Sequence, residues 1–146
     1  MNRRLITVAG LVLGFAVVAT AGTVASGAAL NGAKIAKIVI HHQLRGCHSW
    51  SINGGPFRAS QSVRIDRGGT ITFVNNDVMP HKLIETSGPT VRRDGKAVMG
   101  HMGASAKVVF PKRGLYRFTT KVGEDYMAGV KTIGEDNVLR LNVTVR

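Results

Sequence analysis

The chain has 146 residues, enough for one domain of ordinary size. Lysine and arginine total 20 against 8 acidic residues, which gives a formal net charge of +12, and aromatic residues make up only 5%. The basic residues are scattered, whereas nucleic-acid-binding proteins cluster their cations and interleave them with aromatic residues. We therefore expect no nucleic-acid partner, and scattered positive charge suits an acidic protein or an anionic surface better.

The N-terminal 33 residues do not have the pattern of a folded domain. Met1-Asn-Arg-Arg is followed by 17 uncharged, mostly apolar residues, LITVAGLVLGFAVVATA, and the chain stays uncharged up to Lys34. This layout predicts a secretory signal peptide, or a membrane anchor if it is not removed. We expect residues 1–33 to be that segment with a short linker, and residues 34–146 to form an extracytoplasmic domain (secreted, periplasmic or cell-surface).

The rest of the chain shows short alternating segments separated by turn residues. The expected strands, in chain order, cover residues 36–42, 62–66, 70–75, 81–85, 105–110, 115–120 and 137–146. The sequence DRGG, residues 66–69, is expected to turn the chain between the second and third of them. No segment keeps a helical period over several turns, so the pattern predicts an all-β antiparallel sandwich or barrel.

The expected turn at residues 75–83 contains side chains that reversing the chain does not require. Residues 75–83 read NNDVMPHKL and follow the apolar strand TITFV. Asn-Asn-Asp suffices to reverse the chain, so Met79 and His81 on either side of the proline suggest chemistry.

These segments together resemble the cupredoxins. The resemblance rests on GGTITFVNNDVMPHKL, then SAKVVFPKRGLYRFTT, then a final alternating strand, and it covers roughly residues 35–146. It implies a Greek-key β-sandwich or barrel of the cupredoxin type. It also implies that His81 takes the place of the first copper-binding histidine of the family.

The second half of the family's copper motif is missing. By the match of Tyr116 and Phe118, Thr120 stands where the family has its copper-binding cysteine. The loop that follows, KVGEDYMAGVKTIGEDN, contains no histidine. A hydroxyl cannot replace the thiolate of a blue-copper site, so a standard site of that kind is excluded at those positions.

The family's topology implies that several loops meet at the end of the barrel that carries His81. One of these loops contains GCHSW with Cys47, the only cysteine, which cannot form an internal disulfide. The metal-ligand candidates on these loops are His81, Cys47, His48, His101 and Met102, with weaker claims for Met79, Glu124, Asp125 and Met127.

The candidates have ordinary structural alternatives, and for His81 the alternative is a histidine in a capped turn. Cys47 is otherwise a buried free thiol or an oxidised surface thiol, and Met79 an apolar cover. The alternative for His101 and Met102 is that the 98–104 loop is exposed and binds no metal. The alternative for Glu124 and Asp125 is that they belong to a solvated acidic loop. His41 and His42 are expected on the first strand, one on each face.

Sulfur and imidazole ligands select copper or zinc, and an exported cupredoxin-like barrel favours copper. The function expected first is electron transfer through one copper ion with a rearranged ligand set. The alternatives are copper handling (delivery or sequestration) and a metal-free binding module. The expected partner is a redox or copper-transfer protein, for which an acidic surface would suit this basic chain, and an uncleaved N-terminal segment would attach the protein to a membrane. We expect no enzyme, because no Ser-His-Asp set or paired carboxylates can be argued.

Overall fold

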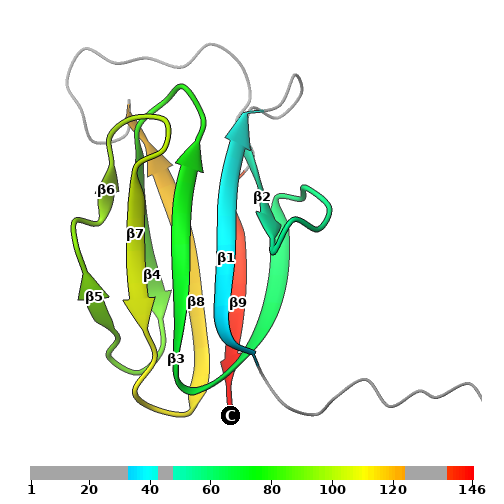
Figure 1. The fold of residues 1–146 in the computed structure, drawn as a ribbon, viewed down its shortest axis with the longest axis vertical. Helices are drawn as coiled ribbons and strands as arrows, with labels where there is room; N and C mark the ends of the chain where they lie inside the picture. The colour runs from blue at the N-terminus through cyan, green and yellow to red at the C-terminus, as the bar shows by residue number, and fades with distance from the viewer. Residues whose placement is uncertain (1–32, 43–47, 124–137) are drawn as a thin grey trace, which may run out of the picture.

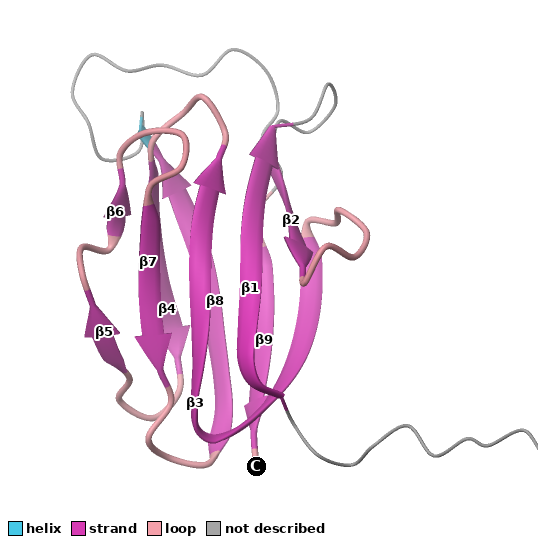
Figure 2. Ribbon diagram, viewed as in Figure 1, coloured by secondary structure: helices cyan, strands magenta, loops and turns pink. Residues whose placement is uncertain are grey.

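The computed structural model describes residues 33–42, 48–123 and 138–146, and Figures 1 and 2 show their fold. Its nine named strands are β1 (Ala33–His42), β2 (His48–Ile52), β3 (Ser60–Asn76), β4 (His81–Ser87), β5 (Arg92–Asp94), β6 (Val98–Met99), β7 (Ser105–Val109), β8 (Gly114–Val122) and β9 (Arg140–Val145). The expected signal or anchor segment lies outside these residues, so the boundary near residue 33 stays a prediction. In the part of the chain that the structure describes, no helix is long and apolar enough to cross a membrane.

The strands form two layers that share β3. Its second half pairs in parallel with β1 and antiparallel with β7, and β2 and β5 extend this layer at its edges. Its first half pairs in parallel with β9, and β8, β4 and β6 continue that layer. In Figure 1, β1 and β7 lie in front of β8 and β9. The all-β sandwich expected from the sequence is confirmed, and its sheet is mixed.

The expected turn at residues 66–69 is wrong in detail. The chain bends there without reversing, so the two strands expected on either side are one 17-residue strand, β3. Gly68 adopts a φ of +79°, and a side chain at Gly69 would meet the Ile65 side chain at 2.6 Å. Two adjacent glycines therefore allow an irregularity that moves one strand from one layer to the other.

The core lies between the layers and follows the alternation seen in the sequence. Every second residue of β9, namely Leu141, Val143 and Val145, is buried. The largest buried side chains include Trp50, Phe73, Phe110, Tyr116 and Phe118. The Tyr116 hydroxyl donates a hydrogen bond to the Lys112 carbonyl at 2.6 Å, which satisfies the polar end of a buried ring.

Gly88 sits at a close approach that only glycine allows. Its φ is +134°, and an added Cβ would lie 2.8 Å from Tyr116 Cδ1. We expect Gly88→Ala to destabilise the protein by roughly 1–3 kcal/mol in urea unfolding, from backbone strain and displacement of Tyr116. Gly54→Ala is the matched control, because Gly54 has a φ of +77° but open space around the added methyl group. Equal losses for both variants would show that the ring contact contributes nothing.

The two ends of the sandwich differ. At one end β1 and β3 finish and β2 and β4 begin (Figure 1); we call this end the site pole. The other end, the opposite pole, holds the start of β1, the bend of β3, the 110–114 turn and the end of β9.

Candidate metal centre

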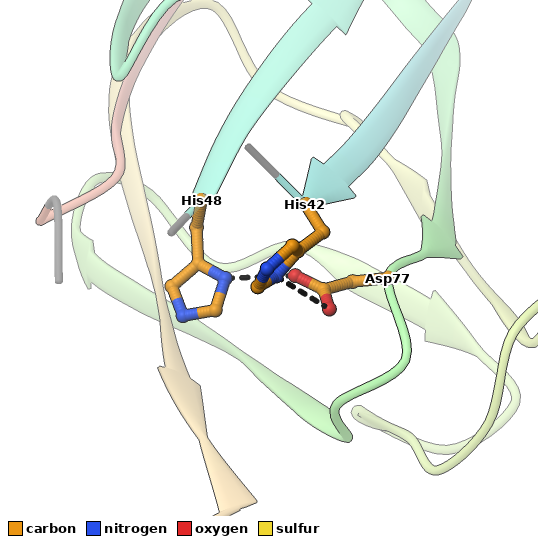
Figure 3. Close-up of side chains that lie close together, drawn as sticks. All are labelled: His42, His48 and Asp77. Atoms are coloured by element: carbon orange, nitrogen blue, oxygen red, sulfur yellow. Dashed lines mark hydrogen bonds and ion pairs between the residues drawn. The ribbon is translucent and has the colours of Figure 1, made fainter. Parts of the chain in front are cut away.

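Three histidines and an aspartate from four separate segments meet at the site pole. His42 ends β1, His48 begins β2, Asp77 directly follows β3, and His81 begins β4. One donor atom from each of His42, His48 and Asp77 lies within 4.8 Å of the others, and Figure 3 shows these three side chains. The rings of His48 and His81 lie edge to face with centroids 4.8 Å apart. The hairpin between β1 and β2 is what pairs His42 with His48 in register.

All three imidazoles turn a nitrogen toward the same carboxylate. His48 Nδ1 lies 2.8 Å from Asp77 Oδ2, and His81 Nε2 lies 3.3 Å from the same oxygen. His42 Nδ1 lies 3.4 Å from the other oxygen, Oδ1. The Asp77 side chain is fully buried, and a buried charge requires such partners.

The loop that carries Asp77 is fixed by hydrogen bonds. Asn75, also buried, accepts a hydrogen bond from the Asp77 amide at 2.9 Å. Its side-chain amide donates to the carbonyls of Met79 at 2.8 Å and Met99 at 3.0 Å. The Met79 amide in turn donates to Asp77 Oδ1 at 3.0 Å. Asn75 makes the expected turn, and the carboxylate is thereby held in one position.

The surroundings of Asp77 favour its charged form. Burial alone raises the pKa of the Asp77 carboxyl, but hydrogen bonds from His48, His81 and the Met79 amide outweigh it. The net result is a pKa well below the usual range of an aspartate. The Asp77 carboxylate is therefore charged at neutral pH and can act as a metal ligand.

Thr120, which the sequence resemblance places at the cupredoxin cysteine position, contacts His81. Its hydroxyl oxygen lies 3.2 Å from His81 Nδ1, while Nε2 of the same ring faces Asp77. Thr120 can accept a hydrogen bond from Nδ1–H, so a metal would bind at Nε2 in place of the hydrogen that this nitrogen shares with Asp77. The hydroxyl cannot supply sulfur chemistry, but it holds the ring in place.

Replacing Asn75 tests whether its hydrogen bonds fix the loop that carries Asp77. We expect Asn75→Ala to lower the free energy of unfolding by roughly 3 kcal/mol, because the carbonyls of Met79 and Met99 and the Asp77 amide lose their partner. We also expect metal affinity to fall about 10- to 100-fold, the usual effect of losing a residue that supports a ligand. Urea unfolding and copper titration measure the two effects. Asn142→Ala on β9 is the control, and an equal stability loss there would contradict a special role for Asn75.

The structure brings together two of the residues expected from the sequence, His48 and His81. His101 and Met102 are exposed, and His101 Nδ1 lies 2.9 Å from the Met102 carbonyl oxygen. Met79 is half-buried and contributes its backbone to the Asp77 loop. Cys47, Glu124, Asp125 and Met127 fall outside the described residues, so their role as ligands stays a prediction.

Two residues of the cluster were not among the expected ligands. The sequence pattern assigns Asp77 to the turn, although a carboxylate three residues before the proline of a Pro-His is a usable signal. His42 was placed on one face of the first strand without a choice of face. Because Ala36, Ile38 and Ile40 are the buried residues of β1, the alternation puts His42 on their face, at the site pole.

Access to the cluster is through His42. Its side chain is 44% exposed, whereas His48, Asp77 and His81 are buried. The Val78 side chain, which follows β3, is also exposed. Among the four described side chains of the cluster, His42 is therefore the one whose imidazole reaches solvent.

The residues present fit a transition-metal ion. Three imidazoles and one carboxylate form a nitrogen and oxygen donor set, which suits copper, zinc, nickel and iron. Affinity for such a set rises along the first-row series to a maximum at Cu(II). The oxygen-only preference of magnesium and calcium does not match three imidazoles.

Comparisons with known proteins concern the fold alone. No protein-family model matches the chain, and no curated protein matches it. Solved structures similar to it include a purple cupredoxin from Nitrosopumilus maritimus (19% identity, 75% of this chain and 98% of that chain, TM-score 0.45). They also include an oxidized amicyanin mutant (15% identity, 75% and 82%, TM-score 0.41) and a multicopper oxidase (12% identity, 79% and 45%, TM-score 0.44).

Proposed function

We propose that this protein binds one copper ion at His48, His81, Asp77 and His42 and transfers electrons through it. One observation carries the proposal: three imidazole nitrogens from three strands converge on one buried carboxylate. Bound copper would supply a one-electron couple. The protein's part is to hold four donors and to expose one imidazole edge.

Rigidity favours electron transfer among the possible copper functions. Asp77 is held by Asn75 and Met79, and His81 is held by Thr120. Ligands fixed by packing and hydrogen bonds reorganise little when the metal changes oxidation state. The exposed edge of His42 offers a place for a redox partner protein to approach. We place the working protein outside the cytoplasm, as its N-terminal sequence predicts.

Copper handling is the second candidate, because two soft or borderline ligands are exposed near the centre. His101 and Met102 lie on the 98–104 loop at the site pole, and Met102 is 54% exposed. Exposed thioether and imidazole groups can capture Cu(I). Delivery or sequestration would therefore show as tight Cu(I) binding without stable Cu(II).

Titration of the metal-free full chain with Cu(II), followed by EPR, tests the proposal. We expect one Cu(II) per chain with hyperfine coupling to several nitrogens, and repeated reduction and reoxidation without loss of copper. Loss of copper on reduction would favour handling over electron transfer. If the protein does not bind stoichiometric copper at micromolar concentrations, the function that remains is a metal-free binding module.

Cys47 provides a separate prediction, since it directly precedes His48 in the sequence. If its thiolate binds the copper, the Cu(II) protein shows an intense sulfur-to-copper absorption band, and Cys47→Ser removes it. A carboxylate together with the thiolate would make the centre more tetragonal and redder than a blue one. A spectrum unchanged in Cys47→Ser would assign the site to imidazole and carboxylate alone.

A further inference from the structure

The opposite pole is a basic surface remote from the candidate metal centre. Backbone contacts join its segments: the Arg67 amide donates to the Arg146 carbonyl at 2.7 Å, and the Gly68 amide donates to the Phe110 carbonyl at 2.7 Å. Ala33 at the start of β1 is in register with Ile65, just before the bend of β3. Five exposed cations therefore gather at this pole: Lys34, Arg67, Lys112, Arg113 and Arg146.

Little in the described structure neutralises this surface. Asp66 is the acidic side chain in these segments, and it is half-buried. None of the five cations has an ion-pair partner among the residues that the structure describes. Ile35, beside Lys34, is 74% exposed and adds an apolar group to the pole. Exposed cations around an apolar side chain form a surface suited to anionic lipid headgroups.

The chain enters the domain at the same pole. β1 begins at Ala33, and the apolar run of residues 5–21 precedes it by an uncharged stretch, residues 22–32. A stretch of that length spans at most about 40 Å. A domain tethered at that distance can reach the bilayer surface with its opposite pole. The five cations would then determine how strongly this pole binds the surface.

We propose that the opposite pole docks on anionic lipid headgroups and thereby directs the site pole away from the membrane. The attraction is electrostatic, and it is largest within a Debye length of the surface. In this orientation the exposed edge of His42 faces the aqueous phase. The proposal concerns a surface distinct from the metal centre and does not rest on copper binding.

The test uses the full chain in lipid nanodiscs that carry a small fraction of gadolinium-labelled headgroups. One preparation contains phosphatidylcholine alone, and the other contains about one-third phosphatidylglycerol. We expect amide NMR signals of residues 66–69 and 110–114 to lose most of their intensity in the anionic discs and to keep it in the zwitterionic ones. Signals of residues 77–81 at the site pole keep their intensity in both, and high salt reverses the effect.

Two charge-reversal variants with the same net charge locate the surface. The pole variant carries Arg67→Glu, Lys112→Glu and Arg113→Glu, and the control carries Arg58→Glu, Lys96→Glu and Arg140→Glu at other exposed positions. We expect the pole variant to lose at least three-quarters of the broadening and the control to keep most of it, with equal urea midpoints.

Three results would overturn the proposal. One is equal broadening in both kinds of disc, and another is equal loss in both variants. The third is an absence of broadening at the opposite pole in both kinds of disc, together with a shift of its amide signals when polyglutamate is added. That result would assign the surface to an acidic protein partner.

Discussion

Replacing His81 with alanine is expected to abolish stoichiometric copper binding. The ring is completely buried, faces Asp77 through Nε2 and is held by Thr120 through Nδ1, so its removal takes away a fixed donor. Loss of a residue that only supports a ligand costs about 10- to 100-fold in metal affinity. Loss of the ligand itself should exceed that, and we expect at least about a 100-fold weaker Kd for Cu(II) by competition titration.

His101→Ala is the control for this experiment. His101 lies on the exposed 98–104 loop and contacts its own neighbour, Met102. We expect its Kd for Cu(II) to stay within about two-fold of the parent value. A loss in His101→Ala with retention in His81→Ala would place copper on the exposed loop and contradict the cluster as the metal site.

Replacing Asp77 with alanine is expected to have the largest effect on the stability of the metal-free protein. The substitution removes the carboxylate to which the three imidazole nitrogens turn and with which the Met79 amide pairs. Removing one partner of a buried charged network costs roughly 3–5 kcal/mol. Urea unfolding measures the loss. Asp94→Ala on the exposed strand β5 should change stability by less than about 0.5 kcal/mol.

The same carboxylate predicts how stability depends on pH. Its pKa in the folded state lies well below the value of about 3.9 in an unfolded chain. A depressed folded-state pKa contributes stability above the unfolded pKa, and this contribution is lost as pH falls toward the folded value. Metal-free protein should therefore lose stability below about pH 4, and Asp77→Asn should lose less over that interval. Identical acid slopes for the two proteins would contradict the charged state of Asp77.

The fold could be predicted from sequence where a segment alternates and ends at a clear turn. Residues 137–146 and 115–120 met both conditions, and they correspond to β9 and β8. The short strands β5 and β6 carry too few residues for a period to appear. The sequence predicts a turn at the bend of β3 because paired glycines favour both structures, and the pairing of β3 with β1 and β9 decides between them.

The candidate site was predictable in part for a similar reason. His81 follows a strand and a proline, and the cupredoxin resemblance predicts His48 in a loop at the same pole, so the sequence indicates both residues. The sequence does not predict Asp77 as a ligand, because Asn75 and Asn76 beside it are sufficient to explain a turn. In the structure the buried Asp77 carboxylate faces three imidazoles. This arrangement depends on the direction of side chains on four separate segments, which the sequence pattern does not specify.

A crystal structure of the copper-loaded protein, with anomalous scattering at the copper edge, is the most direct measurement. We predict one anomalous peak among His42 Nδ1, His48 Nδ1, His81 Nε2 and Asp77 Oδ2, at about 2.0–2.2 Å from the imidazole nitrogens that bind it. A peak at His101 and Met102 instead, or no peak in protein exposed to equimolar copper, would contradict the proposed centre.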